Sequence, residues 1–175
     1  MVTKNRYNNP VTVLLIFAVF CTCCADKLRL AKTPFTGNQL RIDGYYYHQY
    51  TGADGVEYMS VLFLYENGIL HYGGAFPKNK LSEIEQNYST EEWINIVRKL
   101  KYYWGVFLVT GNTIKYKRWY PSEPPLRASI REGVILNDTT FRITKVYDSD
   151  LRREDRLYRF KAFSPKPDST NNFVK

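Results

Sequence analysis

Cysteine is scarce and confined to the beginning of the chain. The three cysteines, Cys21, Cys23 and Cys24, are followed by about 150 residues that contain none. This region therefore cannot form a disulfide, and a domain of about 150 residues buries roughly two-thirds of its unfolded surface without one. The cluster is not expected to bind a metal, because no histidine precedes His48 and no fourth ligand lies nearby.

Residues with catalytic potential are also few. The two histidines, His48 and His71, both lie on predicted strands, and neither has another ligand at metal-binding spacing. The sequence contains no glycine-rich phosphate loop and no nucleophile elbow. If the cysteine cluster is processed as described below, no free thiol remains. We therefore expect a protein that is not an enzyme and that has no cofactor and no metal.

Residues 1–23 have the features of a signal peptide. Lys4 and Arg6 form a basic region without acidic residues, and Val11–Phe20 is an apolar run broken only by Thr12. A helix that spans a bilayer takes about 20 apolar residues, so this shorter run fits the central region of an export signal. A buried N-terminal helix is the alternative, but Pro10 and the following cysteine cluster argue against it.

The cysteine cluster resembles the processing site of a bacterial lipoprotein, in which one cysteine becomes the lipidated first residue. We favour Cys24 as the lipidated residue, with Cys23 as the alternative. Acyl chains on one cysteine would hold the protein at a membrane surface. We therefore expect export to the bacterial cell envelope as an outer-membrane lipoprotein, with a secreted or periplasmic protein as the alternative.

The chain is modestly basic. Its 25 basic and 17 acidic residues give a formal charge of +8, and removal of Lys4 and Arg6 with a signal peptide lowers this charge to +6. The basic residues alternate with apolar ones, which is typical of the solvated face of strands. We expect no nucleic-acid partner, and the sequence does not indicate an oligomeric state.

Turn signals and alternating side chains predict a sequential β-sheet. Gly111-Asn112, Asn137-Asp138 and Asn67-Gly68 lie between apolar runs and are typical of hairpin turns. The expected strands are Gly44–Tyr50, Glu57–Tyr65, Ile69–Phe76, Trp104–Thr110, Thr113–Tyr120, Ala128–Leu136, Thr140–Tyr147 and Asp155–Phe163. An even number of antiparallel strands can close on itself and leave no edge.

We therefore predict a mainly β fold, an eight-stranded antiparallel up-and-down barrel. The barrel is expected over residues 42–163, after a tether at 24–41 and before a flexible tail at 164–175. Residues 89–92 read as a capping box with Ser89 as the capping residue, followed by apolar residues at helical spacing. They predict one α-helix over about 90–101, before the fourth strand, with 148–154 as a charged turn. Gly73-Gly74 within the third strand predicts a bulge or a tight bend.

Alternation along the strands also predicts which side chains face the barrel interior. The candidates for lining a ligand cavity are Tyr116, Arg118, Glu132, Phe141, Tyr158 and Phe160. Because the fifth and sixth strands form a hairpin, we expect Arg118 and Glu132 to approach each other inside the barrel. Such a pair is either an internal salt bridge that fixes the register or an anchor for a carboxylate or hydroxyl group of a ligand.

Several segments resemble small bacterial lipocalin-like lipoproteins over roughly Leu40–Phe163. They are Gly44–Tyr47, Glu66–Gly68, Trp104–Phe107 and Arg131–Phe141. The resemblance implies a barrel that holds a small lipophilic or amphiphilic ligand without catalysis. Two features depart from that family: Tyr46 stands where lipocalins have tryptophan, and the helix precedes the fourth strand instead of following the last.

Two other functions remain open at this point. An interaction protein with a filled barrel would bind a protein or glycan through its rim, its helix or exposed tyrosines. The composition of 15 Tyr, 10 Phe and 3 Trp suits such a surface as well as a cavity lining. A hydrolase or isomerase would use Glu132 or another carboxylate inside the cavity.

Overall fold

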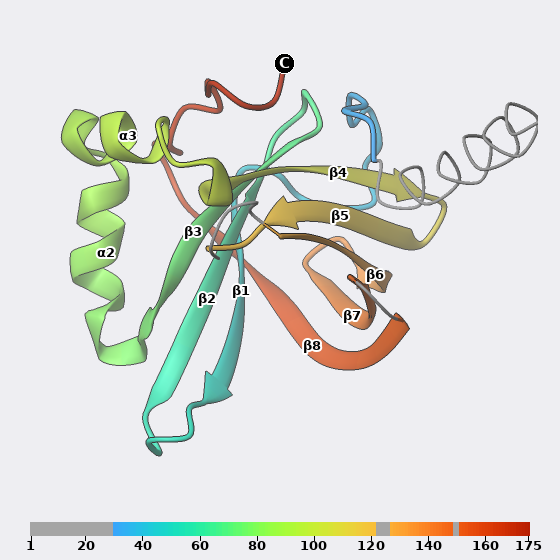
Figure 1. The fold of residues 1–175 in the computed structure, drawn as a ribbon, viewed down its shortest axis with the longest axis horizontal. Helices are drawn as coiled ribbons and strands as arrows, with labels where there is room; N and C mark the ends of the chain where they lie inside the picture. The colour runs from blue at the N-terminus through green and yellow to red at the C-terminus, as the bar shows by residue number, and fades with distance from the viewer. Residues whose placement is uncertain (1–29, 122–126, 149–150) are drawn as a thin grey trace, which may run out of the picture.

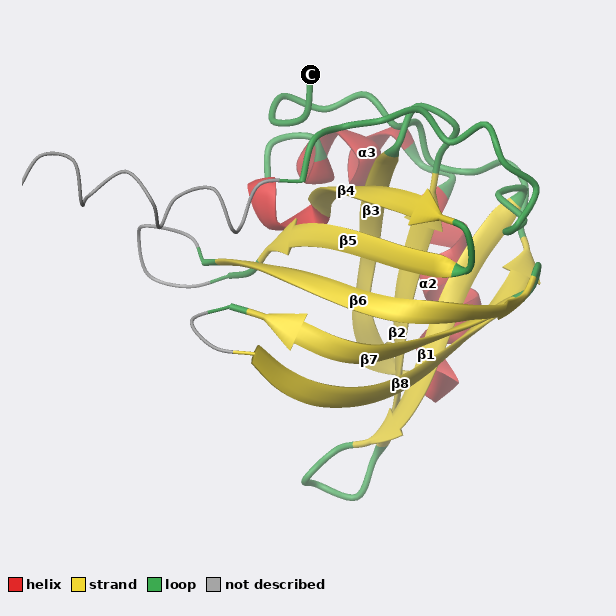
Figure 2. Ribbon diagram, turned by 90° about the vertical axis from the view of Figure 1, so that its right-hand side faces the viewer, coloured by secondary structure: helices red, strands yellow, loops and turns green. Residues whose placement is uncertain are grey.

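The computed structural model describes residues 30–121, 127–148 and 151–175. In this part of the chain, eight antiparallel strands form a closed barrel in sequential order (Figures 1 and 2). They are β1 (Gly44–Thr51), β2 (Glu57–Leu64), β3 (Ile69–Pro77), β4 (Trp104–Thr110), β5 (Thr113–Trp119), β6 (Ala128–Asn137), β7 (Thr140–Tyr147) and β8 (Leu151–Ala162). The predicted up-and-down barrel is confirmed, and it is compatible with a lipocalin-like fold.

Two short helices occupy the connection between β3 and β4, where one helix was predicted. They are α2 (Leu81–Tyr88) and α3 (Glu91–Val97), and the 3₁₀ helices η2 (Lys78–Lys80) and η3 (Lys101–Tyr103) flank them. Helix α3 lies within the predicted range, but its cap is Thr90, whose hydroxyl accepts the Trp93 N–H at 3.3 Å. Helix α2 was not predicted, because its sequence is mostly polar.

Both helices lie beside β2 and β3 on the outer face of the barrel (Figure 1). Strand β2 is consequently covered on both faces, as its alternation predicted. The outer core between helices and sheet comprises Tyr45, Met59, Val61, Phe63, Phe76 and Tyr88. The inner core comprises Leu40, Tyr46, Leu62, Leu64, Leu70, Phe107, Ile114, Tyr116, Ile135, Phe141, Ile143 and Tyr158.

The two glycines of β3 allow α2 to pack closely. The Tyr88 hydroxyl donates a hydrogen bond of 2.8 Å to the Gly73 carbonyl, and a Cβ atom on Gly73 would lie only 2.6 Å from that hydroxyl. Gly74 has a φ of +104°, which favours glycine. The register with β2 shifts at this point, so the predicted bulge is confirmed.

The segments that precede β1 and follow β8 in the sequence close the base of the barrel. The base is the end at which β2, β4, β6 and β8 finish. Within the predicted tether, the Arg41 N–H donates to the Asp138 carbonyl at 2.9 Å, and Leu40 belongs to the inner core. In the segment predicted as a flexible tail, the Lys166 ammonium donates to the Leu64 carbonyl at 2.7 Å, and burial lowers its pKa to about 8. Asp168 pairs with Arg98 at 2.6 Å. This tail therefore packs against the barrel.

His71 on β3 is fully buried between the sheet and the helices. Its ring stacks on Trp104 with 4.5 Å between the ring centroids. Neither ring nitrogen has a hydrogen-bond partner in the described part of the chain. Because burial penalises the charged imidazolium, the pKa of His71 falls to about 3.

We predict that His71 makes the barrel less stable in mild acid. The pKa of His71 is lower in the folded protein than in the unfolded chain, so the unfolded chain binds more protons below about pH 6.5. The free energy of unfolding should then fall by about 1.4 kcal/mol for each pH unit as the pH decreases from about 6 to about 4. Urea denaturation of the wild-type protein and of His71→Phe between about pH 6 and about pH 4 measures how much of this loss of stability His71 causes. Equal pH dependence in both proteins would contradict the prediction.

Candidate functional site

The barrel interior is packed at the base and hollow at the mouth, the end at which β1, β3, β5 and β7 finish. A cavity of about 340 Å³ lies among side chains from β1, β2, β3, β5, β6 and β8. Leu62, Tyr116 and Tyr158 belong to both the inner core and the cavity lining, so they form its floor. The cavity is therefore the part of the interior that the inner core leaves unfilled.

The structure brings together only some of the predicted cavity residues. Tyr116, Arg118 and Tyr158 line the cavity. Phe141 and Phe160 lie in or against the inner core, where both rings pack on Tyr46 with centroid distances of 5.0 and 5.4 Å. These two phenylalanines support the floor of the cavity and are not among its lining residues.

Glu132 lies on the outer face of the barrel, so the predicted contact with Arg118 is wrong. The register pairs Lys115 with Glu132 and Tyr116 with Arg131. The Glu132 carboxylate accepts from the ammonium groups of Lys115 at 2.9 Å and Lys145 at 3.0 Å. The inward position on β6 belongs to Arg131.

Exposed apolar residues caused this error in the phase of β6. Val134 and Leu136 alternate in phase with Glu132, and their apolar side chains favoured placing this face of the strand inside, but they are 45% and 55% exposed. Alternation along β6 itself is uninterrupted, because its ladder with β5 has no register shift and the extra residue beside Glu132 in its ladder with β7 is Thr144 of β7. Apolar alternation alone does not distinguish these two faces.

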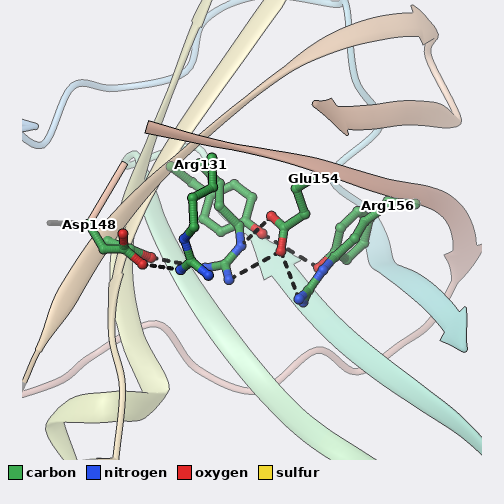
Figure 3. Close-up of polar contacts among 8 residues, drawn as sticks. Arg131, Asp148, Glu154 and Arg156 are labelled. Carbon is green, nitrogen blue, oxygen red and sulfur yellow. Dashed lines mark hydrogen bonds and ion pairs between the residues drawn. The ribbon is translucent and has the colours of Figure 1, made fainter. Parts of the chain in front are cut away.

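A network of arginines and one glutamate lies at the side of the cavity. Glu154 lies between Arg131 and Arg156 (Figure 3). The Arg131 Nε is 2.8 Å from one carboxylate oxygen, and an Arg156 Nη atom is 2.7 Å from the other. The Arg131 and Glu154 side chains are only 10% and 12% exposed, so each ion depends on the other for compensation of its lost hydration.

The sequence analysis missed this network. Residues 148–154 were predicted as a charged turn, whereas β8 begins at Leu151. The signal that would have found it is periodicity, because Glu154 and Arg156 are in phase with the inward residue Tyr158.

Arg118 is as enclosed as Arg131, each with 8% exposure. Its guanidinium carbon lies 3.7 Å from the ring centroid of Tyr72 and 4.2 Å from that of Tyr120. One Nη atom donates to the Tyr102 carbonyl at 3.3 Å. Within residues 30–121, 127–148 and 151–175, no carboxylate forms an ion pair with Arg118. Burial lowers its pKa, but a guanidinium stays protonated in proteins.

Phenol groups supply further polar atoms to the cavity. The hydroxyl oxygens of Tyr116 and Tyr158 are 3.5 Å apart. Burial raises the pKa of Tyr116 well above its ordinary value, so this phenol remains a neutral hydrogen-bond donor. The buried Tyr120 hydroxyl has no hydrogen-bond partner among the described residues. A polar group that is buried without a partner is costly.

The described residues show neither a metal site nor a spanning helix. They contain no group of three or more histidine, cysteine, aspartate or glutamate side chains that would hold a metal ion. His48 lines the cavity, but its Nδ1 lies 3.2 Å from the Leu157 carbonyl. Among the described residues, none of the helices has the length and apolar character needed to cross a bilayer. The lipidation candidates Cys24 and Cys23 lie outside these residues.

Comparison with protein-family models finds no matching family, and searches of curated proteins and of solved structures find no match either. The geometry of the cavity therefore carries the functional inference.

We predict that Glu154→Gln destabilises the barrel far more than Glu132→Gln. The first change leaves two guanidinium groups close together without their shared carboxylate, which should lower the free energy of unfolding by about 3 kcal/mol. The second removes an acceptor on the outer face from two half-exposed lysines, which should cost about 1 kcal/mol or less. Urea denaturation compares the two variants, and equal losses would contradict the structural role given to Glu154.

Proposed function

We propose that this protein is a non-enzymatic binding protein that holds one small amphiphilic molecule in the mouth of its barrel. The observation that carries the proposal is a space of about 340 Å³ bordered by guanidinium and phenol groups. Sites for small molecules are typically about 300 to 1,000 Å³ and combine apolar walls with a few converging polar groups. In this cavity Leu62 supplies apolar surface, and the arginines and tyrosines supply the polar groups.

The geometry favours a binding protein over the two alternatives. A filled barrel that acts only through its rim would have no need of this cavity. An enzyme based on Glu132 would have its carboxylate on the outer face, away from the cavity. The Glu154 carboxylate lies at the side of the cavity, but both of its oxygens accept from guanidinium groups. Neither carboxylate is therefore suited to act as a general base.

We further propose that the protein is a lipid-anchored, lipocalin-like protein of the bacterial cell envelope. The support is the basic N-terminal region, the apolar run at 11–20 and the cysteine cluster that follows. The closed barrel is compatible with this family. Lipidation at Cys24, or at Cys23, would place a soluble binding domain beside a membrane.

The cavity is tested by filling it. Ser60 is buried and lines the cavity, so Ser60→Tyr should occupy the space of the ligand. Native mass spectrometry should detect a small molecule that co-purifies with the wild-type protein and is lost from this variant. Gln49→Tyr adds the same side chain at an exposed position of β1 and should retain the molecule. Repeated absence of any bound molecule from the wild-type protein would contradict the proposal.

The membrane anchor is tested by replacing the two cysteines. We expect Cys24→Ser to move the protein from the membrane fraction to the soluble fraction of bacterial cells, because the acyl attachment site is lost. Cys23→Ser should leave the fractionation unchanged. The reverse result would assign the anchor to Cys23, and no change in either variant would exclude the anchor at this cluster.

A further inference from the structure

We infer that the ligand carries an oxyanion, such as a carboxylate, phosphate or sulfonate group, and that this group binds at Arg118. The inference rests on the proposed function and specifies the chemistry of the ligand. It follows from the charge balance of the cavity, from the enclosure of Arg118 and from polar atoms that lack partners.

Positive charge exceeds negative charge in the cavity wall. Arg118, Arg131 and Arg156 contribute three guanidinium groups, and Glu154 is the carboxylate that faces them. Asp155 also borders the cavity, but its carboxylate pairs with Arg142 at 3.4 Å. Because Glu154 is already shared between Arg131 and Arg156, it does not neutralise the charge at Arg118.

The environment of Arg118 stabilises a cation only in part. The rings of Tyr72 and Tyr120 beside the guanidinium supply cation–π attraction. A guanidinium has five N–H donors, and the contact with the Tyr102 carbonyl uses one of them. Arg118 lines the cavity, so its other donors can reach a molecule that is held there. An oxyanion is the acceptor that best fits a planar guanidinium, because two parallel N–H···O bonds can form.

The phenol groups indicate where the rest of the ligand binds. Tyr120 borders the same cavity as Arg118, and its buried hydroxyl has no hydrogen-bond partner among the described residues. Tyr116 and Tyr158 lie on the floor with their hydroxyl oxygens 3.5 Å apart, so only one of the two O–H groups can donate to the other and the second can donate to a ligand. The cavity therefore suits a small organic acid whose body carries apolar and hydroxyl surface, and suits a long hydrocarbon chain poorly.

Two fluorescent dyes with the same aromatic body test this inference. Anilinonaphthalene sulfonate carries an oxyanion, whereas N-phenylnaphthylamine is neutral. Fluorescence titration should show that the purified wild-type protein binds the sulfonate at least tenfold more tightly, because hydrogen bonds between charged groups are worth roughly ten- to a hundredfold in affinity. Added salt should weaken binding of the sulfonate and leave binding of the neutral dye unchanged.

A matched pair of variants on β5 assigns the effect to Arg118. Arg118→Gln removes a positive charge from the cavity, and Lys115→Gln removes one from the outer face of the same strand. The first should raise the Kd of the sulfonate dye at least tenfold without changing the Kd of the neutral dye, and the second should change neither. If Arg118→Gln does not fold, Arg156→Gln replaces it, since this half-exposed arginine contributes to the same positive wall.

The outcomes separate this inference from the proposed function. Equal affinity of the wild-type protein for the two dyes, or equal effects of Arg118→Gln and Lys115→Gln, would overturn the oxyanion inference and leave the binding function intact. Failure of the wild-type protein to bind either dye would count against both. Discrimination against the neutral dye that is lost only in the cavity variants would support both.

Discussion

Pairing between β1 and β8 is the constraint on which the rest of the structure depends. Four residue pairs, from Gly44 with Ala162 to Tyr47 with Arg159, join the first and last strands. This ladder leaves the sheet without an edge, so every inward side chain must share one enclosed volume. Aromatic and aliphatic residues fill the base, and the space that remains at the mouth is bordered by charged and phenolic groups. The position and the chemistry of the cavity both follow from closure.

The connection between β3 and β4 shapes the cavity from outside the sheet. Only three residue pairs join these two strands, from Ile69 with Val106 to His71 with Trp104. The two helices cover the outer face of β2 and β3, and η3 then returns the chain to the barrel. The Tyr102 carbonyl of η3 accepts a hydrogen bond from Arg118. The connection between β3 and β4 thus contributes side chains to the outer core and a hydrogen-bond acceptor to Arg118.

Local sequence patterns predicted the strands well because turns and alternation act over a few residues. They also predicted the two-sided cover of β2 and the bulge at Gly73. They failed on β6, where apolar residues lie on the outer face: Val134 and Leu136 alternate with Glu132, so this residue was placed inside instead of Arg131. Helix α2 was missed because few apolar contacts with the sheet suffice to hold a largely polar segment. Glu154 was missed because charged residues favoured a turn over a strand.

The placement of the chain ends has a consequence for orientation. Thr33 lies close to the Gly68 turn, and Lys166 donates to carbonyls of Ile42 and Leu64, so both segments that flank the barrel meet it at the base. The described part of the chain therefore enters the domain at the base, at the opposite end from the arginine-lined mouth. A membrane tether attached upstream would hold the protein by its closed base and direct the arginine-lined mouth toward the solvent. A dissolved molecule could then reach the mouth without first entering the lipid phase.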